Sequence, residues 1–98
     1  MECLVLTEVR AGISRDDQLT RRGLENFESY VSTLDAFGEL SAHPSYYRFT
    51  GSPLCKWTAT GARRIVFATL STPIRKVPYV VVVAADDHSI YSEKLSKG

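Results

Sequence analysis

The sequence predicts a single α+β domain in which one amphipathic helix packs on a small antiparallel sheet. Three observations support this fold class: helix-spaced apolar residues over 18–37, strand-like segments separated by turns from residue 46 onward, and an almost uninterrupted β-branched run at Tyr79–Ala85. The 98 residues suffice for one hydrophobic core but not for two. We therefore expect residues 1–98 to form one domain.

The first segment, Glu2–Thr7, contains four consecutive apolar residues and predicts a short strand. Ala11-Gly12 interrupts this pattern. The next residues, Ser14, Asp16 and Asp17, are typical of a helix start, because their side-chain oxygens accept hydrogen bonds from the free amides of a first turn. A helix is thus expected to begin near Gln18.

The helix is predicted over residues 18–37, where apolar side chains recur every three or four positions. The expected buried stripe is Leu19, Leu24, Phe27, Val31, Leu34 and Phe37. Gly38 follows as a natural C-terminal stop. Gly23 lies one turn inside the helix, which indicates either a close approach to the sheet, the interpretation we favour, or a break between two short helices.

Four strands are predicted after the helix: Tyr46–Thr50, Leu54–Thr60, Arg63–Leu70 and Tyr79–Ala85. Turns containing Gly51 and Gly61 separate the first three, and glycine supplies the positive φ that such turns need. The last strand is apolar throughout, which predicts an interior strand covered on both faces.

The charge distribution is uneven, although the formal net charge is only +1. Residues 1–39 carry eight acidic and four basic side chains, whereas residues 40–85 carry six basic side chains and no acidic one. Such segregation indicates a surface for a polyanion. We therefore expect the basic side chains of this segment to converge on one positive patch: Arg48, Lys56, Arg63 or Arg64, Arg75 and Lys76.

Six of the ten aromatic residues lie in the same acid-free segment: Tyr46, Tyr47, Phe49, Trp57, Phe67 and Tyr79. Rings and cations on a strand surface are how single-stranded RNA is often bound. The nucleic-acid-binding candidates are Arg48, Trp57, Arg63, Arg75 and Lys76. Strand alternation places Lys56 opposite Trp57, with only one of Arg63 and Arg64 on its side. Alternatively, the rings form the core and the cations a solvated outer face.

Common catalytic and cofactor motifs do not occur: the sequence has no GxGxxG, P-loop, HExxH or GxSxG pattern. Cys3 and Cys55 lack zinc-site spacing and are expected to be buried thiols. We expect no cofactor and no metal. The apolar runs are too short for a signal peptide or a membrane span, so a cytoplasmic protein without a membrane partner is expected.

The segments FTGSPLCKW (49–57) and GARRIVF (61–67), followed by an apolar strand and the tyrosine-containing tail 89–95, resemble the RelE/HigB family of bacterial toxins. The resemblance implies a RelE-like fold and ribosome-dependent cleavage of mRNA, in which the RNA's 2′-hydroxyl attacks the adjacent phosphate. It also implies mRNA on the ribosome and a cognate antitoxin as partners. The oligomeric state is not predicted.

The resemblance assigns roles to individual residues. Lys56 corresponds to a lysine near the attacking hydroxyl, Arg64 (or Arg63) to an arginine that stabilises the phosphate's charge, and Tyr91 to a tail tyrosine that orients the substrate. Fixed cations suit the charge that develops on a phosphate under attack. His88 is the fourth catalytic candidate, since an imidazole can act as acid or base near neutral pH.

One departure from the family favours other functions. Asp86 and Asp87 stand where such toxins commonly have a basic residue. Two further hypotheses therefore stay open: a non-catalytic member of the same fold, such as a ParE-like gyrase inhibitor, and a small phage- or plasmid-encoded protein that docks on a host protein.

Overall fold

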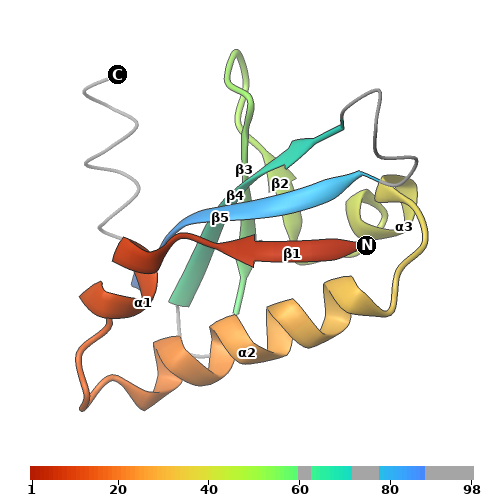
Figure 1. Ribbon diagram of the computed structural model, residues 1–98. Coiled ribbons are helices and arrows are strands. Elements are labelled where there is room, and N and C mark those ends of the chain that lie inside the picture. The colour runs from red at the N-terminus through yellow and green to blue at the C-terminus, as the bar shows by residue number, and fades with distance from the viewer. Residues whose placement is uncertain (60–62, 72–77, 88–98) are drawn as a thin grey trace.

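The computed structural model describes residues 1–59, 63–71 and 78–87. Three helices and five strands form one mixed α/β structure, with α2 lying across one side of the sheet (Figure 1). The helices are α1 (Thr7–Gly12), α2 (Gln18–Ser32) and α3 (Phe37–Ser41). The strands are β1 (Glu2–Val5), β2 (Tyr46–Arg48), β3 (Leu54–Thr58), β4 (Arg63–Leu70) and β5 (Tyr79–Asp87). The α+β fold class is thereby confirmed.

The sheet is mixed rather than purely antiparallel, with strand order β1-β5-β4-β3-β2. β1 runs parallel to β5, and the other three pairs are antiparallel. A parallel pairing requires a long connection, and here it contains every element between β1 and β5: the helices lead to the opposite edge of the sheet, and β2, β3 and β4 return from there to β5. The prediction that Tyr79–Ala85 is an interior strand is confirmed, since β5 lies between β1 and β4.

The core lies between α2 and the sheet. Leu24, Phe27 and Val31 are at most 1% exposed, and Leu34 is 6% exposed, as the helical spacing predicts. Leu19 was wrongly placed on this stripe, because it is 43% exposed near the start of the helix. Across the interface the core consists of Cys55, Trp57, Ile65, Phe67, Val80 and Val82.

The helical region is divided differently from the prediction. α2 ends at Ser32 instead of continuing to residue 37, and Thr33 closes it by donating its hydroxyl to the Tyr30 carbonyl at 2.7 Å. A separate short helix, α3, then begins at Phe37. Residues 7–12, predicted to end a strand and break the pattern, form α1 and bury Val9. None of the helices in the described ranges has the length and apolarity to cross a membrane.

Gly23 is required where α2 meets the sheet, as its position in the helix predicted. A Cβ atom at this residue would lie 2.9 Å from the Cβ of Ala59, which directly follows β3. The predicted turn between β2 and β3 is also confirmed, with Gly51 at φ +72°. Gly61 lies outside the described residues.

Candidate nucleic-acid interface

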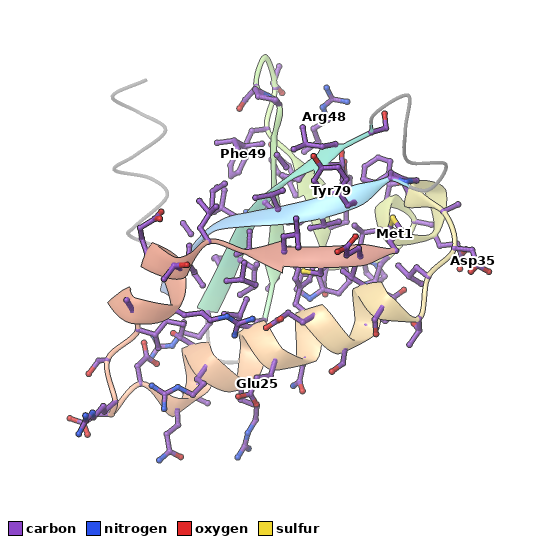
Figure 2. The ribbon with its side chains drawn as sticks, in the orientation of Figure 1. Met1, Glu25, Asp35, Arg48, Phe49 and Tyr79 are labelled. Atoms are coloured by element: carbon purple, nitrogen blue, oxygen red, sulfur yellow. The ribbon has the colours of Figure 1, made fainter. Side chains whose placement is uncertain are left out.

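We call the side of the sheet away from α2 the open face; on it Leu4, Tyr47 and Leu70 are 41–50% exposed, whereas Val66 and Ala84 are only 3% and 4% exposed. It is formed by alternate residues of the strands, which the pleat directs away from the core. Its residues are Glu2 and Leu4 from β1, Tyr79, Val81, Val83 and Ala84 from β5, Arg64, Val66, Ala68 and Leu70 from β4, Leu54, Lys56 and Thr58 from β3, and Tyr47 from β2, followed by Phe49. In Figure 2, Tyr79 lies on the side of β5 away from α2, whereas Glu25 projects from the outer side of that helix.

A bulge in β5 shapes this face. Val66 pairs with Ala84 and Phe67 pairs with Val82, so Val83 is an extra residue on β5. As a result Val83 and Ala84 both pack against the open-face cluster with Val66. The expectation that the valine strand is covered on both faces holds only in part, because on the open face Ala84 is 4% exposed whereas Val81 and Val83 are half-buried.

Lys56 and Arg64 share the open face. Lys56 is paired with Val66, and Arg64, two residues before Val66, is paired with Thr58. The two cations are thus diagonal neighbours on adjacent strands, a relation that brings Cβ atoms within about 7–8 Å. The register identifies Arg64, not Arg63, as the arginine on the side of Lys56.

Lys56 lies over an aromatic ring. Its Nζ atom is 4.9 Å from the centroid of the Tyr47 ring, and Tyr47 is its cross-strand partner in β2. A cation at this position is attracted by the ring's electron-rich face. The Tyr47 ring also meets that of Phe49 edge-on, with centroids 5.6 Å apart and planes inclined at 75°. Tyr47, Lys56 and Phe49 therefore form a contiguous group at the β2 edge.

The Arg64 side chain folds back on the backbone of its own strand, β4. Its Nη1 donates to the Arg63 carbonyl at 3.0 Å, and the side chain is half-buried. Its Nε is buried without a hydrogen-bond partner among the described residues. In the β4–β5 register, Asp86 stands opposite Arg64 and Asp87 opposite Arg63. In the backbone register, one position of the acidic pair, Asp86, is thus opposite the arginine to which the resemblance assigns a catalytic role.

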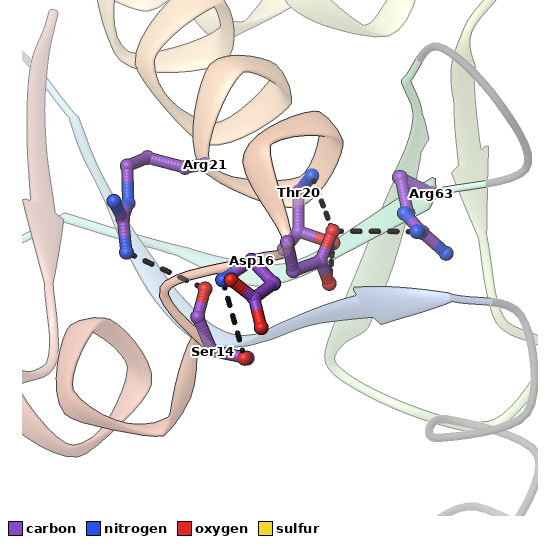
Figure 3. Close-up of polar contacts among 6 residues, drawn as sticks. Ser14, Asp16, Thr20, Arg21 and Arg63 are labelled. Atoms are coloured by element: carbon purple, nitrogen blue, oxygen red, sulfur yellow. Dashed lines mark hydrogen bonds and ion pairs between the residues drawn. The ribbon is translucent and has the colours of Figure 1, made fainter.

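Arg63 belongs to the helix-covered side instead. Its Nη2 lies 3.3 Å from Oδ1 of Asp17, the residue that caps α2 (Figure 3). Asp17 also accepts hydrogen bonds from the Thr20 amide at 3.1 Å and the Thr20 hydroxyl at 2.7 Å. These interactions, above all that with the hydroxyl, lower the pKa of Asp17 below its ordinary value. Arg63 is therefore neutralised by the helix start.

Two further nucleic-acid-binding candidates are not on the open face. Trp57 is 8% exposed, and its ring packs in the core against Phe27, Tyr30 and His43, with centroids 4.4 Å from the nearest of them, His43. It is not available for base stacking. Arg48 pairs with Cys55 and so stands on the covered side, although it is exposed at the sheet edge, at the end of the sheet remote from α2 (Figure 2).

The predicted single patch of cations is therefore not formed by the described residues. The structure brings together Lys56 and Arg64, and it separates both from Arg48 and Arg63. The other candidates lie outside the described residues: Arg75, Lys76, His88 and Tyr91.

Tyr47 is a residue that the sequence had grouped with the other rings without singling it out. Strand alternation separates it from Tyr46, whose hydroxyl contacts the Cys55 thiol at 3.4 Å on the covered side. Burial, followed by the contact with Cys55, raises the pKa of Tyr46 to about 12. Tyr47 is 50% exposed. The sequence shows that Tyr46 and Tyr47 point to opposite faces of the strand. Which of them faces outward depends on the register with Trp57.

The remaining reactive groups fit a structural role. Cys3 and Cys55 are free thiols, and burial, followed by the nearby charge of Glu28, raises the pKa of Cys3 to about 11. No group of three or more metal-ligating side chains occurs within the ranges that the structure describes.

Searches against family models, curated proteins and solved structures found no match to the chain.

Proposed function

We propose that the protein is the toxin of a toxin–antitoxin system and cleaves mRNA on the ribosome, with the open face as its RNA-binding surface. The observation that carries this proposal is the position of Lys56 and Arg64 as diagonal neighbours on one face, opposite the helix-covered side. These are the two described residues to which the resemblance assigns catalytic roles. Their common face is a requirement for joint action on one phosphate.

The proposed chemistry needs fixed positive charge. When a 2′-hydroxyl attacks the neighbouring phosphate, negative charge grows on the phosphate oxygens, and preorganised cations stabilise it. Arg64 serves as that cation, and Lys56 lies beside the attacking hydroxyl. In this proposal the bond from the 2′-oxygen to phosphorus forms as the bond from phosphorus to the 5′-oxygen breaks. The hydroxyl proton passes to water, His88 gives a proton to the leaving 5′-oxygen, and Tyr91 orients the substrate. The partners are mRNA on the ribosome in the cytoplasm and a cognate antitoxin.

The test is inducible expression of the chain in bacteria, with protein synthesis followed by amino-acid incorporation and cleavage sites mapped by primer extension on abundant mRNAs. Wild type should halt translation and produce discrete cuts within coding regions. The double variant Lys56→Ala, Arg64→Ala should lose both effects while keeping its thermal unfolding transition. Cleavage that persists in the double variant contradicts the proposed site.

A matched control is available on the other side of the molecule. Arg15 and Arg22 are exposed and lie in the helical region, away from the open face. The double variant Arg15→Ala, Arg22→Ala removes the same charge and should leave toxicity and cleavage unchanged. If it is as defective as the open-face variant, the effect comes from net charge rather than from a site.

A second candidate function is protein docking without catalysis, which the apolar part of the same face favours. Leu4 and Leu70 are 41% and 44% exposed there, and Asp86 stands in register beside Arg64. A ParE-like gyrase inhibitor or another host-protein inhibitor would use such a surface. In the same experiment this function predicts growth arrest without mRNA cuts, with DNA synthesis failing first if gyrase is the target.

A further inference from the structure

Tyr47 differs from every other aromatic residue that the structure describes. Among the aromatic residues in the described part of the chain, Tyr47 is the most exposed, with 50% of its surface accessible, whereas Trp57 is 8% and Phe67 is 0% exposed. A large ring left in water on an edge strand does little for the core. Half of its surface is therefore accessible to a ligand.

The ring is nevertheless held in a defined orientation. Phe49 meets it edge-on at a centroid distance of 5.6 Å, and Lys56 places its ammonium group 4.9 Å from the ring centroid. Contacts of both kinds favour one ring orientation even at exposed sites. A binding group that is fixed in advance loses less conformational entropy when its ligand arrives.

We propose that Tyr47 is the base-stacking platform of the RNA site, and that the phosphate next to the stacked base is the one contacted by Lys56 and Arg64. This inference rests on the proposed RNA-binding function. It follows from position: the Lys56 ammonium lies over one side of the Tyr47 ring, so a base stacks on the other side with its phosphate within reach of Lys56, and Arg64 is the diagonal neighbour of Lys56 on the same face of the sheet. A base can stack on an aromatic side chain only when it is not stacked in a duplex, so the expected ligand is single-stranded.

The class of ligand can be specified further. Stacking on an aromatic side chain tolerates every base, since each has a π-face, and preferences follow stacking strength. Purines offer the larger ring surface to Tyr47. We therefore expect single-stranded RNA with adenine or guanine at this position to bind more tightly than RNA with uracil.

The test compares two ten-residue probes whose 2′-hydroxyls are methylated so that they cannot be cleaved: an oligoadenylate, and an abasic ribose-phosphate chain of equal charge. Tyr47→Leu should weaken oligoadenylate binding roughly five- to hundred-fold, the range expected for loss of one base–aromatic stack. Binding of the abasic chain should change less than twofold. Tyr47→Phe keeps the ring and should bind both probes like wild type, and Arg64→Ala should weaken both.

Each other outcome overturns the inference. If wild type binds both probes equally, or if Tyr47→Leu weakens neither or both alike, RNA binding stands but Tyr47 is not the stacking residue. If wild type binds neither probe at about 50 mM salt, where phosphate contacts are strong, the proposed RNA function fails and the stacking role with it. Tyr47→Thr, a β-branched residue suited to an edge strand, serves as the second variant if Tyr47→Leu unfolds the chain.

Discussion

The two faces of the sheet are built from the same strands and have different environments. On the covered face Cys55, Ile65, Phe67, Val80 and Val82 are at most 2% exposed and pack against α2. On the open face Leu4, Tyr47 and Leu70 are between 41% and 50% exposed, and burial is confined to the small cluster around Val66 and Ala84, which are 3% and 4% exposed. Neighbouring residues on a strand point to opposite faces. Along each strand, a residue that stabilises the core is therefore followed by one on the candidate binding face.

Two pairs of like residues show this separation. Tyr46 is half-buried and contacts Cys55, whereas Tyr47 is exposed and contacts Lys56. Arg63 pairs with Asp17 at the start of α2, whereas Arg64 stands on the open face. The two residues of each pair are of the same type, so the type does not determine which of them faces the core. The strand register does.

The largest expected effect is on the covered face. Leu24→Ala removes a side chain that is 1% exposed and leaves a cavity between α2 and the sheet. We expect the free energy of unfolding to fall by about 2–5 kcal/mol, as for other buried leucines. Urea denaturation followed by far-UV circular dichroism measures it. A loss below about 0.5 kcal/mol, which is usual for surface sites, would mean that α2 does not carry the core.

The next effect concerns the closest approach of helix and sheet. Alanine in a helix interior is ordinarily about 1 kcal/mol better than glycine, but at Gly23 its Cβ would lie 2.9 Å from that of Ala59. Gly23→Ala should therefore destabilise the fold by about 1–3 kcal/mol, the usual cost of overpacking.

The partner residue supplies the control for this prediction. Ala59→Gly in the same chain removes the atom that the new methyl meets, so the double variant should recover most of the lost stability. The coupling between the two changes is read from a double-mutant cycle in urea. A Gly23→Ala variant that is more stable than wild type would show that α2 lies farther from the sheet.

A smaller effect is expected at the ion pair between α2 and β4. Asp17→Ala removes the helix cap and the contact with Arg63, and should cost about 1 kcal/mol at neutral pH. Asp17→Asn keeps a capping oxygen but loses the charge. Asp17 has a lowered pKa in the folded state, so its charge stabilises the fold above the unfolded pKa, and this contribution is lost as the pH falls through the folded value.

The pH profile tests the charge separately from the cap. The difference in unfolding free energy between wild type and Asp17→Asn should be largest near neutral pH and shrink between about pH 5 and pH 2. A difference that grows on acidification would mean that the folded state raises the pKa of Asp17, contrary to its contacts with Thr20 and Arg63.

The covered face could be predicted from the sequence because one side of a helix and a run of valines both report burial directly. Leu24, Phe27 and Val31 follow from a period near 3.6, and β5 from its composition. The end of α2 could not be predicted, because Leu34 and Phe37 continue the apolar period after the backbone has left the helix. The parallel β1–β5 pair joins segments distant in the chain, which no local pattern reports.

The open face could be predicted only in part. Alternation on β3 placed Lys56 opposite Trp57, and the structure confirms it, but alternation alone did not say which of the two faces is buried. Trp57 looked suited to stacking by type, whereas its register with Ile65 puts it in the core. The ion pair of Arg63 was also hidden, since Asp17 is far away in the sequence. The charge segregation along the chain therefore predicted a larger cationic patch than the one that the described residues form.

The smallest predicted effect tests whether the open face is truly uncovered. Leu4 is the counterpart of Leu24: the same residue type, but 41% exposed on β1 and facing away from the helix. If that face is bare in the isolated protein, Leu4→Ala should change the free energy of unfolding by about 0.5 kcal/mol or less, as at other surface sites. A loss of about 2–5 kcal/mol, the cost at a buried leucine, would mean that something packs on the face in solution. Repeating the measurement over a hundredfold range of protein concentration then separates a second copy, whose contribution grows with concentration, from cover by the chain itself. In either case the surface proposed for RNA would be occupied in the free protein, and binding there would have to displace what covers it.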